Sequence, residues 1–206
     1  MRRAVLLIVA AVALPPLGAA PALAHPHVWV DTIVTAELRN GRIAALQEDW
    51  NFDEDFTASV LDDLHGNKGM METGPHGPTF SAAELAQLKK SAFSNLKHYD
   101  YFTHIWQNGK ATKVAPEVSA FAARMDGDKL RYLFTVALAK PLDPKDGPIR
   151  IGIWDDTYYV DVGPVKGRGA AVSGPGSASC RARIIVDKSH PIYFGSVFPQ
   201  TAEITC

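Results

Sequence analysis

Alternating apolar and polar residues mark the segment that begins at His27. Apolar side chains share one face, while His27, Trp29 and Asp31 fall on the other, and this period of two predicts a β-strand. Asn40 and Gly41 then supply the positive-φ positions of a type I′ turn, and residues 42–52 complete the predicted hairpin. The residues on the apolar face are Val28, Val30, Val34, Ala36 and Leu38.

A two-residue turn also fixes which residues face each other across this hairpin. Counting outward from the turn predicts three opposed pairs: Asp31 with Trp50, Trp29 with Phe52, and His27 with Glu54. Opposed residues share a face, so His27, Asp31 and Glu54 are expected at the edge of a partly dry aromatic pocket. A single β-bulge would undo this register.

Helical signals follow the hairpin. Residues 53–64 carry apolar side chains at intervals of four and acidic residues at their start, which favours a helix. Ser81 and Glu84 form a capping box that opens a second helix, whose expected buried stripe is Leu85, Leu88, Ala92 and Leu96. We therefore predict a helical insertion at residues 53–98.

The rest of the chain has the pattern of short strands separated by turns. Residues 165–179 are rich in glycine without an apolar period, and we expect a mobile excursion there. The predicted strands are residues 101–107, 120–125, 130–138, 149–154, 158–162, 181–186 and 202–206. Together these elements predict an α+β fold, mainly an antiparallel β-sandwich with a two-helix insertion after the first hairpin, as one domain over residues 25–206.

Residues 1–24 have the features of a cleaved signal peptide. A basic start is followed by the apolar run 4–14 and by the small residues Ala22 and Ala24, which precede an expected cleavage after Ala24. No later segment has 18 consecutive apolar residues, so we expect a soluble exported protein that does not itself span a membrane. Periplasmic localisation follows from this interpretation.

Charge and cysteine content narrow the possible partners and the compartment. Removing residues 1–24, which hold two arginines and no acid, leaves 182 residues with 19 Lys and Arg against 22 Asp and Glu, which disfavours a nucleic acid partner. The two cysteines, Cys180 and Cys206, are expected to form a disulfide in an oxidising compartment. Closing that loop would stabilise the fold by roughly 3 kcal/mol.

Four short motifs, in this order, resemble the domain of unknown function 1007 family. They are residues 25–31 (HPHVWVD), 50–56 (WNFDEDF), 99–103 (YDYFT) and 155–160 (DDTYYV). The resemblance implies an exported component of an uncharacterised transport system, associated with membrane permeases of the nickel/cobalt type. Many members are similar in having a calcium-loop-like segment between the two helices. Here the matching stretch from Asp62 lacks the alternating acids of an EF-hand loop.

The mature amino terminus offers three nitrogen ligands for a transition metal ion. They are the α-amine, the imidazole of His25 and the imidazole of His27, and such ligands suit zinc, nickel, cobalt and copper. Pro26 has no backbone N–H, so a square-planar site built on deprotonated amides is disfavoured. We expect a carboxylate, Asp31 or Glu54, to complete the coordination sphere.

Other residues allow two interpretations each. His104, between Phe102 and Trp106, is either a satisfied core histidine or a further metal ligand. Met70, Met71 and His76 are either soft copper ligands or part of a solvated loop. Asp155 and Asp156, followed by Thr157, Tyr158 and Tyr159, are typical of a structural turn.

These observations support one function and leave two alternatives open. The main hypothesis is a periplasmic transition-metal-binding accessory protein, not an enzyme, that serves a membrane permease. The common hydrolase and phosphate-binding motifs are absent from the sequence, which leaves one enzymatic alternative. It is a copper-dependent oxidative enzyme that uses an amino-terminal histidine clamp. The other is a structural docking subunit of a permease without a metal site.

Overall fold

A computed structural model describes residues 26–65 and 80–206 of the chain. Two α-helices follow the first hairpin and the rest is mainly strand, so the predicted α+β class is confirmed. The strands are β1 (Val28–Arg39), β2 (Arg42–Phe52), β3 (Thr103–Gln107), β4 (Lys110–Thr112), β5 (Ser119–Asp126), β6 (Lys129–Leu142), β7 (Ile149–Ile153), β8 (Val160–Pro164), β9 (Ala170–Ser173), β10 (Arg181–Val186) and β11 (Gln200–Thr205). The helices are α1 (Glu54–His65) and α3 (Ala82–Leu96), with short 3₁₀ segments η1 (Lys97–Phe102), η2 (Pro144–Asp146) and η3 (Ser177–Ser179). Within the two described ranges, no helix is long and apolar enough to cross a membrane.

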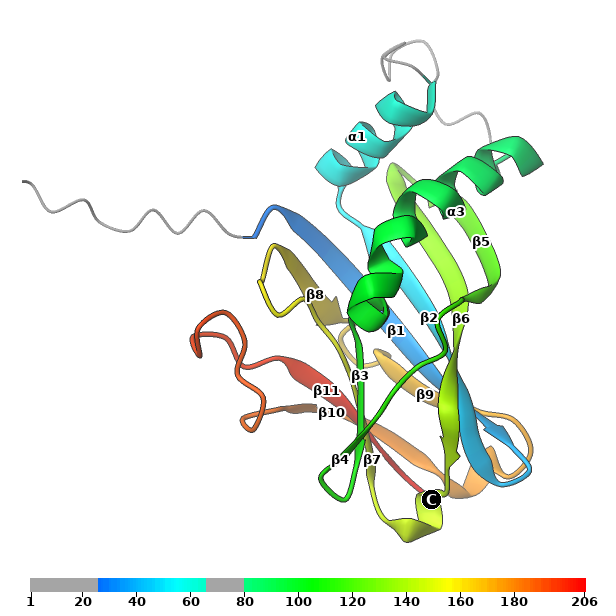
Figure 1. Ribbon diagram of the computed structural model, residues 1–206, viewed down its shortest axis with the longest axis vertical. Helices are drawn as coiled ribbons and strands as arrows, with labels where there is room; N and C mark the ends of the chain where they lie inside the picture. Colours follow the sequence, from blue (N-terminus) through cyan, green and yellow to red (C-terminus); the bar gives the residue numbers. More distant parts are fainter. Residues whose placement is uncertain (1–25, 66–79) are drawn as a thin grey trace, which may run out of the picture.

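The strands form two sheets that enclose the core (Figure 1). The first has the order β5-β6-β2-β1-β8, with β9 also paired to β1, and the second has the order β10-β11-β7-β3-β4. Strands β8 and β9 both run parallel to β1, one beside its first half and one beside its second half. The other ladders are antiparallel, so the mainly antiparallel prediction holds, whereas the parallel edge was not predicted.

The turn of the first hairpin is the predicted one, but the register is not. Asn40 and Gly41 have φ angles of 52° and 75°. A β-bulge between Glu37 and Leu38 shifts the pairing of β1 with β2 by one residue beyond this point. The predicted opposed pairs were therefore wrong, because the bulge adds a residue to one strand.

This shift places Trp29 and Trp50 on opposite faces of the sheet, whereas the predicted register put them on the same face. Trp50 is opposite Thr32, and Asp31 is opposite Asn51. A slip of one residue moves a side chain to the other face of a sheet. Trp50 is therefore buried in the core, whereas Trp29 lies on the outer face with about half of its surface exposed (49%).

The two helices lie together at one end of the sandwich (Figure 1). The predicted capping box is present, because Ser81 Oγ accepts a hydrogen bond from Glu84 N while the Glu84 carboxylate accepts one from Ser81 N. His65 Nε2 lies 3.2 Å from Glu84 Oε1 and links the end of α1 to the start of α3. Leu88 is buried as predicted, and so is Phe93, which was missed.

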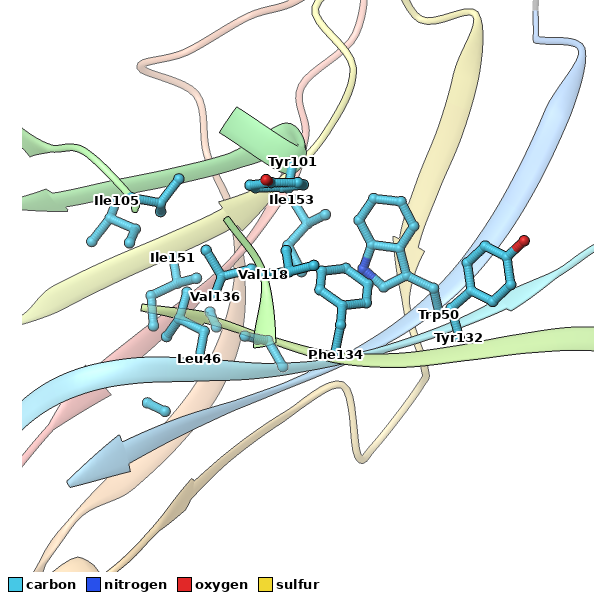
Figure 2. Packing of buried hydrophobic residues seen from close by; sticks show 14 of the residues in the cluster. Leu46, Trp50, Tyr101, Ile105, Val118, Tyr132, Phe134, Val136, Ile151 and Ile153 are labelled. Carbon is cyan, nitrogen blue, oxygen red and sulfur yellow. The ribbon is translucent and has the colours of Figure 1, made fainter. Parts of the chain in front are cut away.

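The hydrophobic core combines side chains from both sheets and from α3. Figure 2 shows members of this cluster that come from the two sheets. Ile105 and Ile151 of the second sheet belong to the same buried cluster as Leu46 and Val136 of the first. Aromatic rings fill the part nearer the helices, where Phe134 packs edge-on against Trp50 with the ring centres 5.3 Å apart. Each fully buried side chain of this size stabilises the fold by about 1.5–3 kcal/mol.

The segment before β3 is a left-handed turn and not the predicted strand. Asp100, Tyr101 and Phe102 have φ angles of 50°, 58° and 57°, so β3 begins only at Thr103. Such a conformation costs roughly 1–2 kcal/mol for each non-glycine residue. Burial of the Tyr101 ring offsets this strain, as does the hydrogen bond that its hydroxyl donates to Pro116 O at 2.5 Å.

Residues 165–179 are ordered, so the prediction of a mobile excursion was wrong. Strand β9 pairs with β1, and backbone hydrogen bonds from Val165 N to Thr32 O and from Val34 N to Gly169 O extend the contact. Gly174 has a φ of 93°, and a Cβ there would lie 2.3 Å from Leu38 O. Glycine thus allows the close approach that the apolar pattern could not reveal.

The predicted disulfide between Cys180 and Cys206 is present. It joins the residues that flank the first pair of the β10–β11 ladder, Arg181 and Thr205. The carboxyl end of the chain is thereby fixed to the second sheet.

Asp53 joins the start of β1 to the start of α1, and its loss should destabilise both. Its Oδ2 accepts a hydrogen bond from Trp29 N at 2.7 Å and its Oδ1 accepts one from Phe56 N at 2.8 Å. We expect Asp53→Ala to lower the free energy of unfolding by about 1–2 kcal/mol, measured by urea titration, because a helix N-cap is lost. Asp55→Ala, in the same helical turn, is the control and should change it by only about 0.3–1 kcal/mol through the helix dipole. Equal effects of the two changes would contradict this role of Asp53.

Candidate functional site

His27 lies at the beginning of β1, close to the first described residue. Its side chain is exposed, its backbone N–H donates to Tyr159 O at 2.9 Å, and its ring centre lies 4.9 Å from that of Tyr159. The other predicted amino-terminal ligand, His25, lies outside the described residues, as do Met70, Met71 and His76. The structure therefore places one imidazole of the predicted amino-terminal site, beside a tyrosine ring.

Asp31 lies on the outer face of the first sheet, away from His27. It lines a shallow pocket of about 150 Å³ together with Trp29, Asp53 and Asp161. Since His27 and Asp31 are four positions apart on an extended chain, their Cα atoms are separated by roughly 13 Å. The predicted pocket shared by His27, Asp31 and Glu54 is not formed, because the bulge between β1 and β2 changed the register on which it depended.

Glu54 stands in the first turn of α1, where it is exposed. The preceding residue, Asp53, donates its backbone N–H to Trp29 O at 3.0 Å. Glu54 therefore lies at the same end of β1 as His27. Of the two predicted carboxylate ligands, Glu54 remains compatible with an amino-terminal site and Asp31 does not.

His104 belongs to a group of stacked rings on the outer face of the second sheet. Its ring lies 4.4 Å from that of Trp154 and nearly parallel to it, and its Nε2 lies 3.2 Å from Trp154 O. Burial lowers the pKa of His104, while the hydrogen bond to Trp154 and the charges of Asp156 and Asp100 only partly oppose this effect. His104 is thus a neutral imidazole whose Nε2–H donates to a carbonyl, as in the core-histidine interpretation.

His190 completes this histidine–tryptophan cluster of His104, Trp106, Trp154 and His190. Its ring stacks on Trp106 with the ring centres 4.2 Å apart, and its Nδ1 lies 2.8 Å from Oδ2 of the buried Asp187. Burial would raise the pKa of Asp187, but hydrogen bonds from Ser189 and His190 together outweigh it and lower that pKa. The signal for this arrangement in the sequence is weak: an aspartate is followed by serine and histidine two and three positions later.

Within the described ranges, no three or more His, Cys, Asp or Glu side chains gather in a way that could hold a metal ion. The His27 environment and the histidine–tryptophan cluster each contain fewer ligands than a closed protein site needs. A metal site in this chain would therefore need ligands beyond the described residues, such as those at the expected mature amino terminus.

Asp155 has the structural role that the sequence favoured. It is buried, and its carboxylate accepts hydrogen bonds from Thr157 N, Tyr159 N and Val160 N. These bonds hold the turn that presents Tyr159 to His27. Asp156 accepts a hydrogen bond from the indole of Trp154 at 3.0 Å, which links this turn to the cluster.

Sequence reasoning missed Glu48, an acid buried between the sheets. It is 1% exposed, and burial raises its pKa to about 7, although hydrogen bonds from Thr103 and Trp50 oppose the rise. The strand pattern contained the signal, because Glu48 shares the parity of the buried Leu46 and Trp50.

The stacked rings require a glycine on the strand beneath them, which a substitution can test. A Cβ at Gly152 would lie 1.9 Å from Cζ3 of Trp154. We expect Gly152→Ala to displace the Trp154 ring and to lower the free energy of unfolding by about 1–3 kcal/mol. Gly163→Ala, where a Cβ meets nothing within 4 Å, is the control. Near-ultraviolet circular dichroism and urea titration measure both effects, and an unchanged indole signal in Gly152→Ala would contradict the packing.

Comparison with known proteins gives a family match over almost the whole chain. Residues 8–206 match the family described as "Protein of unknown function (DUF1007)". The chain is 36% identical over 131 residues to an uncharacterized 15.5 kDa protein in the trpE 3′ region of Spirochaeta aurantia, a match that covers 61% of this chain and 89% of that protein. It is 25% identical over 180 residues to an uncharacterized protein of Haemophilus influenzae, which covers 85% of this chain and 81% of that protein. No solved structure matches the chain. Because the family match spans the described fold from β1 to β11, this chain belongs to the DUF1007 family.

Proposed function

We propose that this chain is an exported, transition-metal-binding accessory protein that serves a membrane permease of a metal transport system. The metal ion, nickel, cobalt, zinc or copper, would be held at the mature amino terminus by the α-amine, His25 and His27. The observation that carries the proposal is the exposed His27 side chain at the very start of β1, only two residues from the expected new amino terminus. Borderline metal ions prefer such nitrogen ligands.

Two features support export to an oxidising compartment. Residues 1–24 have the composition of a cleaved signal peptide. The disulfide between Cys180 and Cys206 is of a kind that persists outside the reducing cytosol. Both features support the proposed periplasmic localisation.

The neighbours of His27 suit a site that binds and releases an ion. Tyr159 packs beside the imidazole, and Glu54, one of the two predicted carboxylate ligands, lies at the same end of β1. An exposed site with few protein ligands leaves coordination positions for a second protein to supply. This property suits a carrier that passes an ion to a permease.

The exposed aromatic residues near this site favour a second candidate, a docking subunit of the permease. Tyr159 is about half exposed, and Phe194 is fully exposed at a turn whose residue Tyr193 donates its backbone N–H to Asp156 O. Aromatic side chains dominate the energetics of protein interfaces. In this role the amino terminus would contact the partner without binding metal.

Calorimetric titration of nickel, cobalt, zinc and copper(II) tests the amino-terminal site. Protein that begins at His25 should bind one ion tightly, and His27→Ala should weaken binding at least tenfold, about 1.4 kcal/mol. His104→Ala is the matched control, because His104 lies in the histidine–tryptophan cluster and not at the amino terminus. The affinity of this variant for the metal ion should stay within about twofold of the wild type.

An additional residue before His25 separates the possible functions further. It moves the α-amine while retaining both imidazoles, so tight binding should be lost. Binding without turnover supports the carrier, whereas copper-dependent peroxide formation with a reductant would support an oxidative enzyme. If no version binds a metal, the carrier proposal is wrong and the docking role is favoured.

A further inference from the structure

Glu48 occupies the inner face of the first sheet, where an acid is least expected. Its neighbours across the two adjacent strands are Val34 of β1 and Phe134 of β6, and its exposed surface is 1%. Figure 2 shows the same region, with Trp50 and Phe134 on one side of the core and Tyr101 on the other. A charge placed here loses nearly all of its hydration.

The hydrogen bonds of Glu48 join the two sheets. Its Oε2 accepts a hydrogen bond from Trp50 Nε1 at 2.9 Å, and its Oε1 lies 2.8 Å from Thr103 Oγ1. Thr103 is the first residue of β3, in the opposite sheet. The same Oγ1 lies 3.1 Å from Tyr101 O, which belongs to the left-handed turn Asp100–Phe102.

Counting protons shows which form of Glu48 satisfies this arrangement. A threonine hydroxyl has one proton, whereas an ionised carboxylate and a carbonyl are both acceptors. If Glu48 is ionised, Thr103 can donate to only one of the two acceptors. If Glu48 is protonated at Oε1, it donates to Thr103 Oγ1, and Thr103 in turn donates to Tyr101 O, so all three groups are paired.

We propose that Glu48 is a proton switch that couples β2, through Thr103, to the left-handed turn between the helical insertion and the second sheet. The protonated form closes the chain of hydrogen bonds and holds the turn. Loss of the proton leaves either the Tyr101 carbonyl or the carboxylate short of a hydrogen bond and loosens the turn at Asp100–Phe102. The strain of three consecutive left-handed residues makes this turn the element most sensitive to such a loss.

No neighbouring charge offers another explanation for the behaviour of Glu48. In the described part of the chain Glu48 forms no ion pair. The side chains that face it from β1, β6 and β3 are Val34, Phe134 and Thr103, none of which titrates. From η1, Tyr101 can ionise, but its hydroxyl donates to Pro116 O. On β2 itself, Asp49 has the opposite parity and pairs with Arg131.

The direction of the pH effect follows from the burial of Glu48. Burial raises the pKa of Glu48 from 4.5 to about 7, so the folded state binds this proton more tightly than the unfolded chain. The contribution of Glu48 to stability is therefore greatest below pH 4.5, declines as the pH rises, and is fully lost above about pH 7. Ordinary surface carboxylates, with depressed pKa values, act in the opposite direction and at lower pH.

Glu48→Gln tests the switch, because an amide reproduces the protonated acid without titrating. Its Nε2 can donate to Thr103 Oγ1, while its Oε1 accepts from Trp50 Nε1. We expect the urea midpoint of the variant to exceed that of the wild type by an amount that grows between pH 4.5 and about pH 7 and then becomes constant. Histidine titration occurs in both proteins and cancels in this difference.

Glu37→Gln is the matched control, since Glu37 is paired with the exposed Arg39, which lowers its pKa. The difference in urea midpoint between Glu37→Gln and the wild type should not grow between pH 4.5 and 7. If the difference between Glu48→Gln and the wild type does not grow either, the proposal is wrong.

Infrared spectroscopy of the unaltered protein keeps the proposal testable if Glu48→Gln does not fold. A protonated-carboxyl band should be present at about pH 6 and disappear by about pH 8, as expected from a carboxyl pKa near 7. The hydrogen-exchange protection factors of the amides at residues 100–103, which already account for the faster intrinsic exchange at higher pH, should fall over the same interval. Absence of the band at about pH 6, or protection factors that do not change, would overturn the switch.

Discussion

The pairing of β1 along both of its edges is the constraint on which the rest of the structure depends. One edge takes β2, and the other takes β8 and then β9, so the first hairpin, the turn after β7 and the glycine-rich segment all meet on this strand. The alternation of β1 assigns its even-numbered side chains to the core and leaves the odd-numbered ones outside. His27 and Tyr159 are brought together because Tyr159 directly precedes β8, beside the start of β1.

Much of this arrangement could be predicted from local chemistry. The Asn40–Gly41 turn, the Ser81 capping box, the disulfide and most strands follow from residues that act over short distances. The errors came from long-range effects. The bulge at Glu37 and Leu38 depends on the pairing of whole strands, and the left-handed turn before β3 depends on the burial of Tyr101. Strand β9 forms only because β1 offers a free edge to a segment that has no periodicity of its own.

The candidate site was predicted in part, and for the same reasons. His27 is exposed at the start of β1, as expected, but the partners assigned to it by counting were displaced by the bulge. His104 lies in a cluster with Trp106, Trp154 and His190, whose members come from β3, the end of β7 and a loop near the carboxyl end. Only the tertiary fold brings these rings together. Glu48, in contrast, could have been identified from strand parity, because an acid at a buried position must be paired or protonated.

The two predicted histidine ligands that the structure describes lie in different places: His27 at the amino-terminal end of β1, and His104 in the histidine–tryptophan cluster on the second sheet. Nuclear magnetic resonance of isotope-labelled protein that begins at His25, with one equivalent of copper(II) added, distinguishes them most directly. A paramagnetic ion broadens the signals of nearby nuclei. If the amino terminus holds the ion, broadening should centre on His27 and Tyr159 and leave the indole signals of Trp106 and Trp154 sharp. Broadening centred on His104 or His190, or none at one equivalent, would contradict an amino-terminal metal site.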